Sequence, residues 1–195
     1  MNYANEITRS LSTIREMLTD RGLDASDLDN LGDNEITNLV RERARFFVEC
    51  NKCSTAILFD VSAKLTWKDT MKTYDEYVDR IEGEKQLLII VVRDSSELKK
   101  SKQDVNHDNY QIFDLEELQF NKSHHHLVFK HELVTDYKEY QNILVNYQLK
   151  SLTQLPIILK MDPQAKYLNA KPGQVVRVYR ISPTSGTNIV YRYVT

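Results

Sequence analysis

The chain has 195 residues, of which 28% are charged and 41% hydrophobic, as in an ordinary globular protein of one or two domains. No apolar run approaches the roughly 20 residues of a membrane span, and the N-terminus has no signal-peptide pattern, so we expect no membrane partner. Two cysteines do not make a disulfide framework, which favours a reducing compartment.

Charge is distributed unevenly along the chain. Residues 131–195 carry eight Lys or Arg and four Asp or Glu, a net charge of +4, whereas residues 1–130 carry a net charge of −6. A net acidic segment does not coat DNA by charge alone, so a DNA contact in the first part would need a local basic patch. Lys99, Lys100 and Lys102 are its one compact basic cluster, although such a run is more often a solvated face.

The first part of the chain alternates between helical and strand-like patterns. Apolar residues spaced by three and four positions predict helices, and short β-branched or apolar runs predict strands. Helices that alternate with strands indicate an α/β fold. The expected helices cover 7–20, 34–50, 69–82 and 95–105, and the expected strands cover 55–61, 85–93 and 110–115.

Residues 155–195 hold all four prolines and two of the five glycines, which predicts short strands held by fixed turns. Asp162 followed by Pro163 is typical of a helix start, and Asn169 of a left-handed helix end. Alternation after Gly173 indicates a strand with Val176 and Val178 on one face. The expected elements are strands over 157–159, 174–181 and 189–194, a helix over 164–168, and turns at 172–173 and 182–186.

These motifs form an ordered series. It consists of LPII at 155–158, DPQAKY at 162–167, GQVV at 173–176, then Arg180, Ser182, Thr184 and Gly186, and YRYV at 191–194, with HELV at 131–134 upstream. The series resembles the C-terminal domain of the fifth-largest common subunit of eukaryotic RNA polymerases and of its archaeal counterpart. Two positions depart from the family pattern: Ile157 replaces the usual Arg or Lys, and Ile181 a common Pro.

The resemblance implies an N-terminal jaw-like α/β domain over 1–123, followed by a small mixed α+β assembly domain over 124–195. It implies a non-catalytic subunit of a multisubunit DNA-directed RNA polymerase. The tail would dock on the largest subunit, and the jaw would border the downstream DNA channel. No cofactor and no small-molecule substrate are expected. The expected interface residues are Pro156, Asp162, Pro163, Tyr167, Arg180, Tyr191 and Arg192, and the expected DNA contacts are Lys99, Lys100 and Lys102.

Upstream of the tail the resemblance to the jaw is confined to a few positions, chiefly Ile14-Arg15, Leu18 and Arg21-Gly22, together with a buried strand. This divergence points to a diverged or virus-encoded member. We therefore expect the nucleus as its location if it is cellular, and the viral factory in the host cytoplasm or the virion if it is viral.

Other residue clusters have common structural explanations. Cys50 and Cys53 lack a second cysteine pair for zinc, successive side chains of the run 124–126 (three His) would point to alternate faces, and Asp114, Glu116 and Glu117 fit a solvated helix start. No phosphate-binding loop, nucleophile elbow or metalloprotease motif is present. The alternative is a free-standing nuclease-like α/β protein with a C-terminal binding module, which co-purification with polymerase chains would distinguish.

Overall fold

The computed structural model describes residues 3–30, 36, 38–39, 45–50, 52–60, 72, 75–77, 87–93, 110–182 and 186–195. The chain forms two units, Met1–Phe120 and Asn121–Thr195, each built around one four-stranded sheet. This mixture of helices and sheets confirms the expected fold class.

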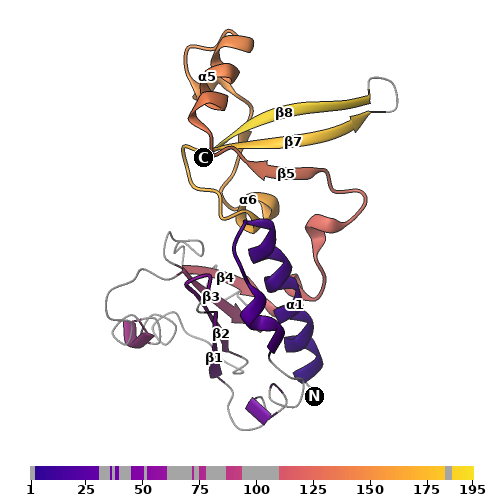
Figure 1. Ribbon diagram of the computed structural model, residues 1–195, viewed down its shortest axis with the longest axis vertical. Helices are drawn as coiled ribbons and strands as arrows, with labels where there is room; N and C mark the ends of the chain where they lie inside the picture. The colour runs from indigo at the N-terminus through magenta and orange to yellow at the C-terminus, as the bar shows by residue number, and fades with distance from the viewer. Residues whose placement is uncertain are drawn as a thin grey trace. The chain divides into compact units, whose positions relative to one another are not determined.

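The sheet of the first unit combines parallel and antiparallel pairing. Its strand order is β1-β2-β3-β4, with β1 antiparallel to β2 and the other neighbours parallel (Figure 1). The elements are α1 (Ala4–Asp20), η1 (Ser26–Asn30), β1 (Arg45–Cys50), β2 (Thr55–Asp60), β3 (Leu87–Val92), β4 (Tyr110–Asp114) and η2 (Leu115–Leu118).

Burial explains why these segments take these forms. Every residue of β2 and all but the first of β3 are buried, as expected for central strands covered on both faces. In α1 the residues Ile7, Ile14 and Leu18 share one fully buried face, which confirms the predicted amphipathic helix. Full burial of each such side chain contributes about 1.5–3 kcal/mol, so this face holds the helix in place.

The expected helix over 34–50 is wrong in its second half. Ile36, Asn38 and Leu39 are helical, but Arg45–Cys50 is strand β1, with Phe46, Val48 and Cys50 buried at alternate positions. Aromatic and β-branched residues with period two favour a strand, and β1 pairs with β2 in register from Cys50↔Thr55 to Arg45↔Asp60. Of the expected helix over 69–82, residues 72 and 75–77 are helical; the expected helix over 95–105 lies outside the described residues.

The second unit contains a long β-hairpin with short elements around it. Its strand order is β5-β7-β8-β6, with β7 antiparallel to both β5 and β8, and β6 parallel to β8 (Figure 1). The elements are η3 (Lys122–His124), β5 (Lys130–Leu133), α5 (Tyr137–Asn146), η4 (Leu152–Gln154), β6 (Ile157–Ile158), α6 (Pro163–Tyr167), β7 (Val175–Ser182) and β8 (Gly186–Val194).

The predicted helix start at Asp162 and the left-handed backbone at Asn169 and Gly173 are confirmed, whereas residues 183–185 of the predicted turn at 182–186 lie outside the described residues. The Asp162 carboxylate accepts a hydrogen bond of 2.9 Å from the backbone N–H of Gln164, and Pro163 occupies the first turn of α6. Asn169 has φ +53°, and Gly173 and Gly186 have φ +94° and +70°. Asn169 follows α6, Gly173 precedes β7 and Gly186 begins β8, and positive φ is readily adopted by glycine.

The hairpin separates two apolar clusters because alternate β7 side chains point to opposite faces. One cluster packs against α6 and consists of Ile158, Ala165, Ala170, Val176, Val178 and Val194. The other packs against α5 and consists of Val134, Ile143, Leu155 and Val175, with half-buried tyrosines around it. The sheet of this small unit is therefore covered on both faces near β6, whereas residues such as Ile181 at the far end of the hairpin are exposed.

Candidate assembly surface

A charge network fixes the α5 face of the second unit. The Arg177 guanidinium on β7 lies 2.7 Å from the Glu132 carboxylate of β5 and 2.9 Å from the Glu139 carboxylate of α5. The hydroxyls of Tyr179 and Tyr191 donate to Glu132 at 2.7 Å and to Glu139 at 3.2 Å. One arginine thus joins two strands and a helix, and its two carboxylates are also held by tyrosines.

Lys130 completes this network at the edge of the sheet. Its ammonium group lies 2.6 Å from the Glu132 carboxylate, and both side chains neighbour the Tyr179 ring. Hydrogen bonds from Lys130, Tyr179 and Arg177 lower the pKa of Glu132 to about 2. The carboxylate therefore stays ionised and internally paired at neutral pH. The sequence pattern does not predict this network, because the network depends on cross-strand register.

Three of the predicted interface residues serve helix α6 directly. Asp162 caps it, Pro163 is exposed in its first turn, and the hydroxyl oxygen of Tyr167, at its end, accepts a hydrogen bond of 2.9 Å from the Asn121 side chain. Asp162 and Tyr167 thus have structural roles within this unit. Their contacts with a partner stay a prediction.

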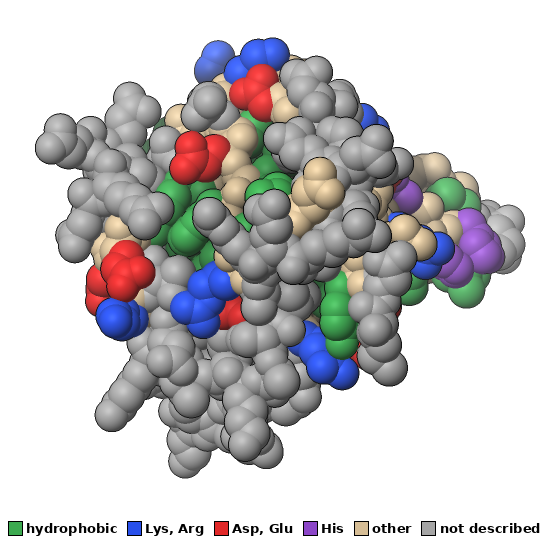
Figure 2. Space-filling model, turned by 90° about the horizontal axis from the view of Figure 1, so that it is seen from below, with side chains coloured by type: hydrophobic (Ala, Val, Ile, Leu, Met, Phe, Trp, Pro, Cys, Tyr) green, Lys and Arg blue, Asp and Glu red, His purple; other side chains and the backbone are tan. Residues whose placement is uncertain are grey.

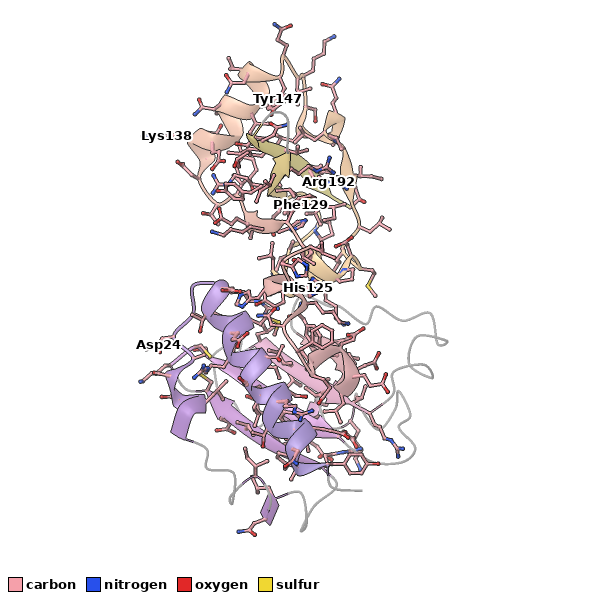
Figure 3. All side chains as sticks on the ribbon, turned by 90° about the vertical axis from the view of Figure 1, so that its right-hand side faces the viewer. Asp24, His125, Phe129, Lys138, Tyr147 and Arg192 are labelled. Carbon is pink, nitrogen blue, oxygen red and sulfur yellow. The ribbon has the colours of Figure 1, made fainter. Side chains whose placement is uncertain are left out.

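Two predicted arginines lie on the α6 side of the hairpin. Arg180 is exposed, and the half-buried Arg192 donates to the Ile157 carbonyl oxygen at 3.4 Å (Figure 3). Burial lowers the pKa of His131, and the positive charges of Arg192 and Arg180 lower it further. This side of the hairpin therefore presents positive charge near an imidazole that favours its neutral form.

The other two predicted residues, Pro156 and Tyr191, line a groove of about 440 Å³ beside β8. The Tyr191 ring packs edge-on against Tyr147, with 6.0 Å between the ring centroids. The groove is lined by Tyr147, Leu149, Gln154, Leu155, Pro156, Asn188, Ile189, Val190 and Tyr191. The seven predicted residues therefore occupy three places: α6, the positive side of the hairpin, and this groove.

Exposed apolar side chains around β6 were missed as candidate interface residues. Ile157, Leu159 and Met161 are 58%, 61% and 49% exposed, although Ile158 between them is buried. Exposed apolar side chains that lie close together are candidates for a surface that binds another molecule. The signal in the sequence was Ile157 itself, an apolar residue where a charge was expected.

The predicted DNA contacts Lys99, Lys100 and Lys102 lie outside the described residues. On the face shown in Figure 2, the described acidic and basic side chains are scattered and do not gather in one patch.

The cysteine pair and the histidine run form no metal site among the described residues. Cys50, at the end of β1, and Cys53, in the turn before β2, are buried free thiols, and burial raises the pKa of Cys50 to about 11. His124, His125 and His126 are exposed, with the last two rings 4.4 Å apart. Among the described residues, no three potential metal-ligating side chains come together. No described helix is long and apolar enough to cross a membrane.

The second unit is thus a small mixed α+β module with an exposed apolar and cationic surface. Residues 120–194 match the family described as RNA polymerase Rpb5, C-terminal domain. The chain is 49% identical over 70 residues to the DNA-directed RNA polymerase subunit Rpo5 of Methanocaldococcus jannaschii, and the match spans 36% of this chain and 87% of that protein. It is 42% identical over 78 residues to the RPABC1 subunit of RNA polymerases I, II and III of Caenorhabditis elegans.

The match covers most of the archaeal relative, so the chain belongs to the Rpb5/Rpo5 family of RNA polymerase subunits. The match to the Caenorhabditis elegans subunit covers 40% of this chain and 36% of that protein. A similar match to the rpabc1 subunit of Dictyostelium discoideum, 42% identical over 80 residues, covers 41% of this chain and 40% of the relative. The suspected resemblance is confirmed, and it favours the polymerase subunit over the free-standing nuclease.

Proposed function

We propose that this chain is a non-catalytic subunit of a multisubunit DNA-directed RNA polymerase, and that its C-terminal unit docks on the largest subunit. The observation that carries the proposal is the coincidence of the family match, 120–194, with one folded unit, Asn121–Thr195. A module that folds around its own two cores can be placed intact on a partner.

The surface of this unit supports a docking role. Ile157, Leu159 and Met161 form an exposed apolar strip around β6, and Arg180 and Arg192 provide positive charge on β7 and β8. The buried core of a protein interface is largely apolar, and arginine is enriched among the residues that supply most of the binding energy. We therefore assign the predicted contacts of Arg180 and Arg192, together with this apolar strip, to the partner subunit.

For the N-terminal unit we propose a place beside downstream DNA in the assembled polymerase, with Lys99, Lys100 and Lys102 at the phosphates. Its support is the family resemblance and the compact basic cluster in an otherwise acidic segment. Lysine contacts to phosphates position a duplex without reading its sequence. The protein would act wherever its polymerase acts, in the nucleus or, for a viral polymerase, in the viral factory or the virion.

Co-purification tests the central proposal. A tagged full-length chain expressed in its native cells should retain the large polymerase subunits at a fixed ratio through a high-salt wash. Leu159→Asp together with Met161→Asp should lower that ratio at least several-fold, because the charges oppose burial of the apolar strip. The control is Leu127→Asp, at a more exposed apolar residue before β5. Recovery of the chain alone would refute the proposal.

A further inference from the structure

Among the described strands, only β6 pairs with the outer edge of β8, and it does so over two residue pairs. β6 pairs with it only at Ile157↔Tyr193 and Ile158↔Val194, whereas β7 lines the other edge from Gly186 to Tyr193. Within the described residues, no further strand lies along the outer edge. An uncovered strand edge presents N–H and C=O groups that can pair with another extended chain.

Hydrogen bonds at the end of β8 show which amides face outward. The Val194 N–H donates to the Gln174 carbonyl, on the β7 side, and the Tyr193 N–H donates to the Pro156 carbonyl, on the β6 side. Amide directions alternate along a strand, so the N–H groups of Thr187, Ile189 and Tyr191 point away from β7. An added strand would find three donors at regular spacing.

The groove described above follows this same edge. Four consecutive β8 residues, 188–191, line it although their side chains alternate between the two faces, so the groove runs along the strand rather than across one face. Tyr147, Leu149 and Pro156 also line the groove (Tyr147 is labelled in Figure 3). An added strand would lie about 4.8 Å from β8, beside the β8 residues that line the groove.

The net charge of the second unit indicates which kind of extended segment would pair with β8. All four carboxylates of residues 131–195 are engaged within the unit: Glu132 and Glu139 with Arg177, and Asp136 and Asp162 at the starts of α5 and α6. The same residues carry a net charge of +4. Lys150 follows the groove residue Leu149 in the sequence and is exposed. An occupant with Asp or Glu side chains therefore meets complementary charge.

We propose that the outer edge of β8 binds an extended acidic segment of another polymerase subunit, with apolar residues at alternate positions, as a fifth strand of the sheet. The inference rests on the proposed function and deepens it by naming the binding mode and the chemistry of the partner segment. Main-chain pairing to Thr187, Ile189 and Tyr191 supplies affinity, and the apolar wall and positive charge select the side chains.

Amide hydrogen exchange of the full-length ¹⁵N-labelled chain tests the binding mode. The probe is the blocked peptide Glu-Val-Asp-Ile-Glu-Val-Asp. Saturation with it should slow exchange of the outward amides of Thr187, Ile189 and Tyr191 by about tenfold or more, because they acquire hydrogen bonds. The amides of Asn188 and Val190, already paired with β7, should change little and serve as the internal control.

Two further peptides separate charge from main-chain pairing. Replacing the acidic residues by lysine should weaken binding about tenfold at low salt, with the difference shrinking as salt is added. Replacing alternate residues by proline should abolish protection. Unprotected outward amides in saturating acidic peptide, or equal protection by the basic peptide, would overturn the inference. So would protection that rises with protein concentration in the absence of peptide, since the occupant would then be a second copy.

A variant pair links the edge to the polymerase. Ile189→Pro removes one outward N–H, and Ile189→Ala shortens the same side chain but keeps that N–H. With the fold verified by slow exchange of the inward amides, the proline variant should be recovered with polymerase several-fold less than the alanine variant. Equal incorporation of both variants rejects only this inference. Failure of the parent chain to incorporate rejects the proposed function itself.

Discussion

Asp162 combines a capping role with a predicted interface role, and these can be separated. Its carboxylate accepts the Gln164 N–H at 2.9 Å, so Asp162→Ala should destabilise the C-terminal unit by roughly 1 kcal/mol. Asp162→Ser keeps a capping oxygen and should restore most of the stability. The measurement is urea unfolding followed by the amide signals of β7 and β8. If the serine variant is stable but binds polymerase poorly, Asp162 also contacts the partner.

Glu132 makes the stability of the C-terminal unit depend on pH. Its folded-state pKa of about 2 lies below the ordinary value of 4.5, so its pairing stabilises the fold fully above about pH 4.5. This contribution is lost as the pH falls through the folded-state value. Glu132→Gln should cost about 1 kcal/mol at pH 7, a modest amount because solvent screens the site, and almost nothing at pH 2.

The check on Glu132 is the difference in unfolding free energy between parent and variant, measured from pH 7 to pH 2. That difference isolates Glu132 from the other carboxylates. Tyr179→Phe removes one of its hydrogen bonds and should show a smaller difference with the same sign. A gap between parent and Glu132→Gln that widens toward acid would contradict the assignment.

At the scale of the elements, Gly186 begins β8 with φ +70°. A β-branched residue is strained there, so Gly186→Val should destabilise the hairpin by about 1–2 kcal/mol. Space is not the obstacle, since a Cβ at this position would meet no atom within 4 Å. Gly186→Asn is the matched control because asparagine tolerates left-handed backbone. Equal melting of the two variants would show that backbone strain is not the cause.

The residue pattern predicted the elements whose formation depends on neighbouring residues in the sequence. The strands β3, β7 and β8, the cap at Asp162 and the left-handed Asn169 follow from apolar runs and turn residues. Helix α5 was missed because Ile143 is its one buried residue, which leaves little apolar periodicity. The pattern over β1 was ambiguous between helix and strand, and pairing with β2 favours the strand.

The candidate site likewise combines features that depend on local sequence with features that depend on tertiary contacts. Motif order located the module and residues such as Pro156 and Tyr191, which line one groove. It did not reveal that Arg177 lies between Glu132 and Glu139, since that contact joins residues 45 and 38 positions apart. The free edge of β8 is likewise a property of strand order, to which no single residue type points.

For the whole molecule, the two units should divide the work of assembly and DNA engagement. Changing Lys99, Lys100 and Lys102 together to Glu should leave incorporation into the polymerase intact, because we propose the docking surface in the C-terminal unit. The same change should weaken retention of downstream duplex DNA, most strongly at low salt, where phosphate contacts count most. Retention of DNA by the purified complex is therefore measured over a salt series.

The reciprocal change is Tyr167→Ala with Arg180→Ala and Arg192→Ala, which should lower incorporation several-fold. Tyr167 also holds Asn121 through a hydrogen bond, so Tyr167→Phe with both arginine changes serves as a variant that keeps the ring. Subunit stoichiometry in pull-downs reports assembly, and DNA retention by whatever complex forms should match the parent. If the lysine variant fails to assemble while the arginine variants assemble normally, the two roles are reversed and this division of labour is wrong.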